Sequence, residues 1–377
     1  MRTERRYDID WLRVIAIGLL LIYHISIVFQ PWALFIAFMQ SNESLQVLWK
    51  PMSMLNVWRI PLLFFVSGMG LYFAMRKRTW QQLLLERTKR ILLPFVFGIV
   101  AIVPLHMMIF LQYYKLPITY DLHQGHLWFL GNIFIYVLLL FPVFFYLKKH
   151  ANGTFQKRLS KFMSYPVAPL VIAIFFVIEV ELIAPQQFSL YAETWHGFFM
   201  GLLAFFFGYI VVYSGQNFWN TLLKWKWLYL GVGIILFSIR MAQFGIEIPG
   251  YLFAIESNAW IFGLFGLSYT YLNKPSKILN YLSKAAYPIY IIHMFVLYAV
   301  SSLILPLSLN GYLKFISIVL FTFLGCFGIY ELCIKRINFL KPLFGLQGSY
   351  QEINRMKLLS IIKNKATTSN AIKKKQK

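Results

Sequence analysis

Ten long apolar runs divide most of this 377-residue sequence, and each is close to the length that crosses a lipid bilayer. A transmembrane helix needs about 20 mainly apolar residues. The chain is 59% hydrophobic and 13% charged, whereas soluble domains average about 45–50% and about 25%. The sequence therefore predicts an all-α polytopic membrane protein with about ten transmembrane helices. The expected spans are residues 11–29, 54–75, 91–112, 126–147, 165–184, 195–213, 225–244, 253–272, 285–305 and 312–333.

The distribution of basic residues predicts how these helices are oriented. Lys and Arg total 36 against 13 Asp and Glu, a formal net charge of +23. With ten spans, 30 of the 36 fall on the side that carries both chain ends, as is typical of cytoplasmic loops. The other six lie in the opposite loops or inside spans: Lys50, Lys115, Lys314, Arg13, Arg59 and Arg240. We therefore expect both termini in the cytoplasm, a multi-pass protein of the cell (inner) membrane, and no nucleic-acid partner.

The sequence divides into a membrane domain, residues 1–345, and a basic C-terminal segment, residues 346–377. Apolar periodicity stops at Ile362, and the segment ends in four lysines within its last five residues. We expect this segment to be a flexible cytoplasmic tail. A solvated tail is the simpler interpretation, and contact with anionic lipid is the alternative.

Arg13 and His24 lie eleven residues apart in the first span. Eleven steps of 100° come within about 20° of three full turns, so both side chains share one helix face, about 16 Å apart along the axis. An ionisable side chain inside a membrane costs at least about 2.5–3.5 kcal/mol, which makes it a functional candidate. A cation below an imidazole suits a groove that binds an anionic group and transfers a proton. A structural hydrogen bond between helices is the alternative for His24.

Arg87 and Arg90 precede the third span and share a helix face, because residues three apart are neighbours on a helix. Two guanidinium groups at a membrane surface can clamp a phosphate through paired hydrogen bonds. The alternative is simple positive-inside anchoring, for which lysine would serve equally well.

Other ionisable residues in or near the spans have simpler interpretations. His106 suits a packing or capping role. Glu179 and Glu181 are about 200° apart on a helix, so they cannot both face the same groove. His123 and His126 flank an outer loop, but no Cys or carboxylate pattern supports zinc there, and we expect no metal site.

Five sequence features occur in an order that is typical of one membrane-protein family. They are IDWLRVIA at 9–16 with His24 following, PLLFFVSG at 61–68, the R-x-x-R spacing of Arg87 and Arg90, HLWFL at 126–130, and SKAAYPIYIIH at 283–293. Together they resemble the membrane acyltransferase-3 family, over about residues 7–340. The segments 9–13 and 126–130 look most like its glucan-modifying O-acyltransferase subgroup.

The resemblance implies transfer of an acyl group, acetyl or succinyl, from cytoplasmic acyl-CoA to a hydroxyl of an extracytoplasmic carbohydrate or glycan. O-Acetylation of a polysaccharide would be one such reaction. Arg13 and His24 match the family's functional pair, and Arg87 and Arg90 its donor-side arginines. Acyl-CoA would be a co-substrate, with no permanently bound cofactor. His24 would deprotonate the acceptor hydroxyl or carry the acyl group covalently.

Three further residues are weaker candidates for contacting the acceptor or the oxyanion: Arg59, His293 and Glu256. Arg59 could stabilise a developing oxyanion or contact sugar. Glu256 and Arg240 lie in adjacent spans, and we favour a structural pair for them over catalysis. Some family members carry an extracytoplasmic esterase-like domain after the tenth helix. Here the membrane domain itself, or a separate export or biosynthesis partner, would complete the transfer.

Two other classes of function compete with this interpretation. A proton-coupled secondary transporter could use the intramembrane His, Arg and Glu residues, but the second half shows no counterpart of the two arginine-containing patterns. A scaffold without chemistry could pack its helices through Gly197 and Gly201, although such a spacing is common.

Overall fold

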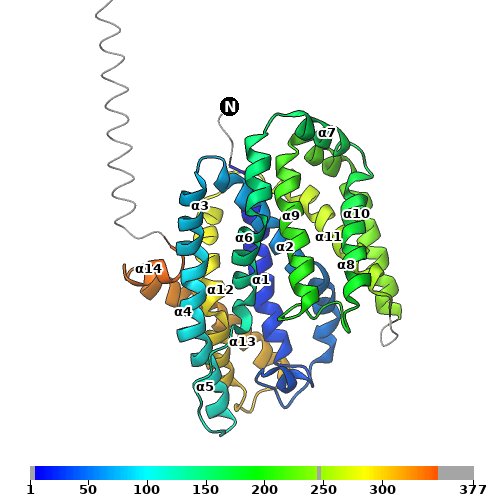
Figure 1. Cartoon of the computed structure of the whole chain (residues 1–377). Helices are drawn as coiled ribbons and strands as arrows, with labels where there is room; N and C mark the ends of the chain where they lie inside the picture. Colours follow the sequence, from blue (N-terminus) through cyan, green and yellow to red (C-terminus); the bar gives the residue numbers. More distant parts are fainter. Residues whose placement is uncertain (1–4, 244–247, 347–377) are drawn as a thin grey trace, which may run out of the picture.

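The computed structural model describes residues 5–243 and 248–346, and these ranges contain helices and loops but no strand (Figure 1). Its helices are α1 (Tyr7–Ile27), α2 (Trp49–Met75), α3 (Trp80–Arg87), α4 (Leu93–Phe97), α5 (Val103–Tyr113), α6 (Trp128–Lys149), α7 (Thr154–Phe162), α8 (Ala168–Ile183), α9 (Trp195–Tyr213), α10 (Gln216–Ala242), α11 (Gly250–Tyr271), α12 (Lys277–Ile304), α13 (Gly311–Ile329) and α14 (Leu340–Leu343). The predicted tail, except its first residue, lies outside the described residues.

The predicted fold class is confirmed: the chain is an all-α polytopic membrane protein. Each expected span overlaps a helix or a continuous helical stretch, and eight stretches in the described ranges are long and apolar enough to cross a membrane. The other two expected spans correspond to α8, which has 16 residues, and α11, which carries the polar residues 256–258. Apolar side chains on α10 and α13, among them Ile235 and Leu324, are exposed and suit contact with lipid tails.

Helix α1 lies in the middle of the bundle, in contact with α2, α11, α12 and α13 (Figure 1). Helices α2 and α9 pack with unusually close backbones. A Cβ at Gly68 would lie 1.9 Å from the Phe205 carbonyl oxygen, and one at Gly208 would lie 2.1 Å from that of Phe65. Small residues allow such contact inside a membrane, where packing drives helix association. These contacts hold α2 in place between α9 and α1.

The two ends of the bundle are built differently. We call the end at which α1 begins, near α3 and α7, the basic end (Figure 1). At the opposite end, residues 28–48 fold back under the helices and bury Phe29, Ala33 and Met39 completely. The Tyr298 hydroxyl of α12 donates to the Ala37 carbonyl at 2.5 Å, which ties this segment to the bundle. Residues 28–48 thereby close part of the bundle at the end nearer to His24.

Candidate active site

One cavity of about 1090 Å³ runs through the middle of the helix bundle. Its lining at the basic end includes Arg13, Arg87, Arg90, Ser283 and Lys284. At the opposite end the lining comes from three segments that connect helices: residues 36–38, His123 with Gly125, and residues 189–193. Between them the walls carry polar and aromatic side chains: His24, Arg59, His106, His126, Trp128, Phe129, Tyr287 and Tyr290. The structure therefore places the two first-helix candidates, the two donor-side arginines and Arg59 around a single space.

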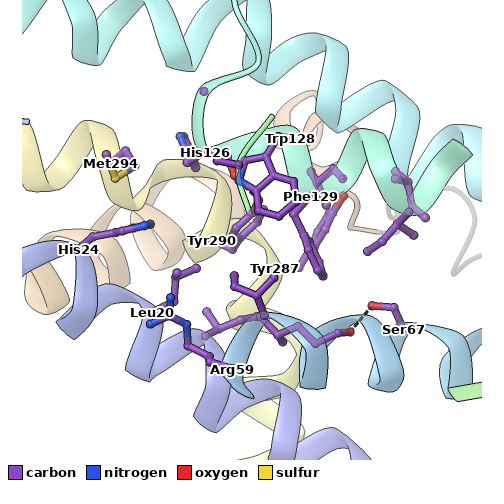
Figure 2. Close-up of a pocket in the computed structure, with 18 of the residues that line it drawn as sticks. Leu20, His24, Arg59, Ser67, His126, Trp128, Phe129, Tyr287, Tyr290 and Met294 are labelled. Carbon is purple, nitrogen blue, oxygen red and sulfur yellow. Dashed lines mark hydrogen bonds between the residues drawn. The ribbon is translucent and has the colours of Figure 1, made fainter. Parts of the chain in front are cut away.

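His24 of α1 is paired with His293 of α12. The His24 Nδ1 lies 2.9 Å from the His293 Nε2, and the rings are nearly parallel, with centroids 5.1 Å apart. His293 is 1% exposed, and its Nδ1 lies 2.5 Å from the Tyr290 carbonyl oxygen. His24 lines the cavity, whereas His293 stands behind it. Figure 2 shows His24, Leu20 and Arg59 on one side of the cavity, with Tyr290, Trp128 and Phe129 across from them.

The site contains two more histidines, which the sequence analysis did not assign to it. His126 borders the His293 ring at a centroid distance of 4.9 Å, and its Nε2 lies 3.0 Å from the Ile291 carbonyl oxygen. His106 packs against His126 and also lines the cavity, with its Nδ1 3.3 Å from the Ile102 carbonyl oxygen. Within the described residues, no three His, Cys, Asp or Glu side chains form a group that could hold a metal ion.

Arg59 is a buried cation on α2 beside these histidines. Its side chain is 1% exposed, and its guanidinium carbon lies 4.2 Å from the centre of the Tyr23 ring. Its Nε and Nη1 are buried without a hydrogen-bond partner in the described part of the chain. Buried polar groups are normally paired, and an unpaired buried charge is expensive. Arg59 is therefore ready to bind an anionic or partly charged oxygen in the cavity.

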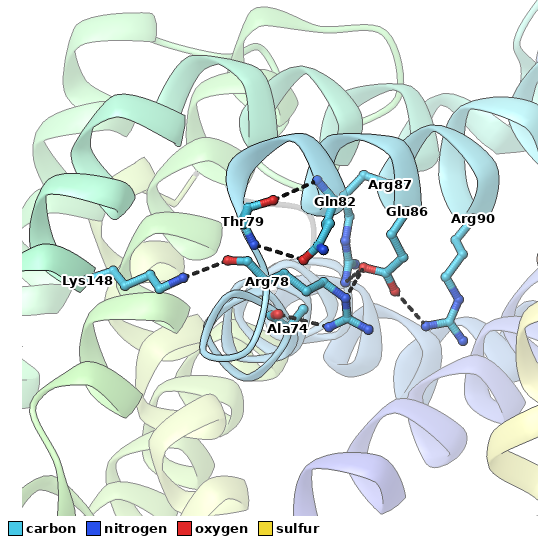
Figure 3. Close-up of polar contacts among 8 residues, drawn as sticks. All are labelled: Ala74, Arg78, Thr79, Gln82, Glu86, Arg87, Arg90 and Lys148. Atoms are coloured by element: carbon cyan, nitrogen blue, oxygen red, sulfur yellow. Dashed lines mark hydrogen bonds and ion pairs between the residues drawn. The ribbon is translucent and has the colours of Figure 1, made fainter. Parts of the chain in front are cut away.

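Glu86 forms ion pairs with three arginines at the basic end (Figure 3). It accepts hydrogen bonds from Arg87 at 3.1 Å and Arg90 at 2.9 Å, and its carboxylate lies 3.7 Å from Arg78 Nε. Helix α3 begins nearby at a capping box, in which Thr79 and Gln82 each accept from the other's backbone N–H. One carboxylate among three guanidinium groups leaves net positive charge at this mouth of the cavity.

Pro94 explains the local shape of the helix that carries these arginines. A proline has no N–H to give to the carbonyl four residues earlier, here that of Arg90, and its ring crowds that carbonyl. The helix widens into a π-helical turn, Thr88–Leu92, which ends two residues before Pro94. Such turns are frequent at functional sites. Arg87 and Arg90 therefore both reach the cavity lining, although Arg90 lies within the widened turn.

Arg13 stands at the basic end of α1 and is already partly neutralised. Its Nη1 lies 3.5 Å from Asp10, which also accepts two hydrogen bonds from Arg5. The Arg13 side chain is 34% exposed, so it remains available to a ligand. Between it and the deeply placed His24, the cavity is lined by Ile17 and Leu20 of the same helix.

The sequence makes Glu256 a weaker candidate for contacting the acceptor, but its side chain does not lie in the lining of this cavity. Glu256 pairs with Arg240, accepting at 2.9 Å from both Nε and Nη2, and Nη2 also lies 3.4 Å from the Ser53 carbonyl oxygen. Both side chains are at least nine-tenths buried. The pairing that the sequence suggested for these two residues is thus present, and it links α10 to α11 and α2.

We expect Glu256→Gln to destabilise the protein without altering its chemistry. Breaking a buried ion pair leaves the Arg240 charge uncompensated and costs about 3–5 kcal/mol. Thermal unfolding in detergent should show a lower Tm, while the folded fraction keeps its turnover rate. The double variant Arg240→Met/Glu256→Leu should recover most of the lost Tm. A selective loss of turnover at unchanged Tm would instead place Glu256 in the site.

The loop between α8 and α9 closes part of the opposite end and is held by a buried pair. His196 Nδ1 lies 2.9 Å from Glu179 Oε1, and its Nε2 lies 3.0 Å from the Phe188 carbonyl oxygen. Glu181 is exposed, as the predicted opposite faces of these two glutamates require. Burial raises the pKa of Tyr191 well above its usual value, so its hydroxyl stays protonated and donates to the Val57 carbonyl at 3.2 Å.

Fold and site together define a polytopic membrane protein with an internal cavity that joins a cationic mouth to a cluster of histidines. A family model described as an acyltransferase domain, that of the acyltransferase-3 family, matches residues 6–331. The chain belongs to this family and is an acyltransferase. Family membership therefore decides against the transporter and scaffold interpretations. No curated protein and no solved structure matched the chain in the corresponding comparisons.

Proposed function

We propose that this enzyme transfers an acetyl or succinyl group from acyl-CoA, bound at the basic end, to a carbohydrate hydroxyl that enters from the opposite end. The observation that carries this proposal is the single cavity, lined by Arg13, Arg87 and Arg90 at one end and by His24 in its middle. Phosphate groups of CoA require cations outside the bilayer core, and a hydroxyl nucleophile requires a base within reach.

The chemical step follows from this placement. His24 takes the proton of the acceptor hydroxyl as its oxygen forms a bond to the thioester carbonyl carbon. The carbon–sulfur bond then breaks, and the CoA thiolate takes up a proton as it leaves. Arg59, whose Nε and Nη1 have no hydrogen-bond partner among the described residues, stabilises the negative charge that develops on the carbonyl oxygen. Covalent transfer through an acyl-His24 intermediate is the alternative route to the same product.

The proposal extends to the setting of the enzyme. The basic end would face the cytoplasm, in a cell (inner) membrane, because acyl-CoA is made there and because basic loops stay on that side. The acceptor would be a glucan or related glycan, and a biosynthesis or export protein would present it. In support of this orientation, residues 36–38 and 189–193 at the opposite mouth include no Lys or Arg.

Turnover of acyl-CoA by the purified protein tests the proposed function. Acetyl-CoA and succinyl-CoA are supplied in turn with glucan oligosaccharides, and release of free CoA is followed together with the mass of the sugar. We expect one acyl group on the sugar for each CoA released. Complete failure of both donors, with the protein folded, would contradict the donor assignment.

Arg87→Lys should raise the KM for acyl-CoA roughly 10-fold, with a much smaller effect on kcat. Lysine keeps the charge but loses the paired hydrogen bonds of the guanidinium group, each worth about 1.5–3 kcal/mol when charge-assisted. The matched control is Lys89→Ala, which removes a charge two residues away from outside the cavity lining. If Lys89→Ala raises KM as much as Arg87→Lys, general surface charge rather than a phosphate clamp binds the donor.

A further inference from the structure

The hydrogen bonds around His293 determine which of its ring nitrogens carries a proton. Its Nδ1 lies 2.5 Å from the Tyr290 carbonyl oxygen, and a carbonyl oxygen can only accept. Nδ1 must therefore carry hydrogen and donate. In a neutral imidazole only one nitrogen is protonated, so His293 Nε2 is left as an acceptor.

The same reasoning then sets the tautomer of His24. Its Nδ1 lies 2.9 Å from His293 Nε2, and since that nitrogen accepts, His24 Nδ1 must be the donor. The proton of neutral His24 is thereby on Nδ1, and the lone pair is on Nε2. Among the described residues, the hydrogen bonds of His24 do not involve Nε2, and its side chain lines the cavity.

We propose that His293 is a positioning residue, which holds His24 in the tautomer whose Nε2 lone pair faces the substrate cavity. The relay runs from Tyr290 carbonyl to His293 Nδ1–H, and from His293 Nε2 to His24 Nδ1–H. When the acceptor hydroxyl gives its proton to His24 Nε2, the imidazolium keeps its Nδ1–H bond to neutral His293. That proton goes on to the departing thiolate, and the neutral tautomer is restored.

The surroundings of His293 favour this direction of the relay. His293 is 1% exposed, and its acceptor partner is a main-chain carbonyl whose chemistry cannot change. The near-parallel rings, with 5° between their planes, keep the two facing nitrogens aligned. Without His293, a neutral His24 would be free to carry its proton on Nε2, and it could then accept nothing from the substrate side.

Nitrogen-15 NMR of histidine-labelled protein in lipid nanodiscs reads the tautomer directly. The His24 signals are identified by their loss in His24→Gln. In the unaltered protein we expect a protonated Nδ1 and an unprotonated Nε2, and in His293→Phe a shift toward protonated Nε2. A His24 that carries its proton on Nε2 in the unaltered protein, or that does not respond to His293→Phe, would overturn the proposal.

Turnover of the His293 variants tests this proposal only if the proposed function is right, whereas the NMR measurement of the His24 tautomer does not depend on that function. The failure of one can therefore be told from the failure of the other. His293→Phe should lower kcat roughly 10- to 100-fold, the range typical of residues that orient a functional side chain, and leave KM for acyl-CoA unchanged. His293→Gln should recover much of kcat, because its amide oxygen can accept from His24 Nδ1–H. Equal losses in both variants, parallel to a fall in Tm, would mean that His293 only packs.

Discussion

Replacing His24 with alanine is expected to lower kcat for acyl transfer by about 10²–10⁴-fold, the usual contribution of a positioned general base. KM for acyl-CoA should change little, because the arginines that would bind CoA lie at the basic end of the cavity. The readout is CoA release and acylated sugar, measured on protein that elutes as a single folded species.

The matched control for this prediction is His150→Ala. His150 is exposed after α6 and lies outside the cavity lining, so its loss should not affect turnover.

Acid quenching in the absence of acceptor separates the two roles open to His24. A base leaves the protein mass unchanged, whereas covalent catalysis adds one acyl group that His24→Ala cannot carry. Turnover of His24→Ala within threefold of the unaltered protein would exclude both roles.

Arg59→Met should lower kcat by about 10²–10³-fold, as loss of one oxyanion-stabilising group does. The same change should leave Tm unchanged or higher. Within the part of the chain that the structure describes, the guanidinium Nε and Nη1 are buried without hydrogen-bond partners, so an apolar side chain of similar length removes a costly charge. Turnover and thermal unfolding are measured on the same preparations.

This pairing of lost activity with retained stability distinguishes a functional cation from a structural one. If the role of Arg59 were structural, its replacement would lower Tm, as we expect for Glu256→Gln. Arg59→Lys is the intermediate case, since it keeps a charge near the cavity but loses the planar fork. If Arg59→Met lowers Tm and leaves kcat intact, the proposed oxyanion role is wrong.

Most of the fold was open to prediction because helix length and apolar character are local properties. The ten runs located the ten long helical stretches of residues 5–243 and 248–346, and α-helical spacing alone put Arg13 and His24 on one face. Three features were not foreseen. Helix α7 lies in a polar loop, the π-helical turn depends on Pro94, and residues 28–48 fold back so that Phe29, Ala33 and Met39 are buried against the bundle.

The site was less accessible to sequence reasoning, because its key contacts join distant segments. His24 and His293 are 269 positions apart, and only the packing of α12 on α1 brings their rings together. His126 lies in an expected outer loop and begins the HLWFL segment, but nothing in the sequence places its ring beside that of His293. The link between Arg240 and Glu256 was foreseeable, since buried opposite charges in adjacent spans favour pairing.

Acyl transfer between separated compartments tests the central claim, that one cavity joins a donor site at one membrane face to an acceptor site at the other. The protein is reconstituted in sealed vesicles with a glucan oligosaccharide trapped inside and labelled acyl-CoA outside, and a trapped dye reports leakage. With the label on the acyl group, the account predicts labelled sugar inside intact vesicles, free CoA released outside, and no transfer by His24→Ala. Labelled sugar formed only when donor and acceptor share a compartment would contradict it.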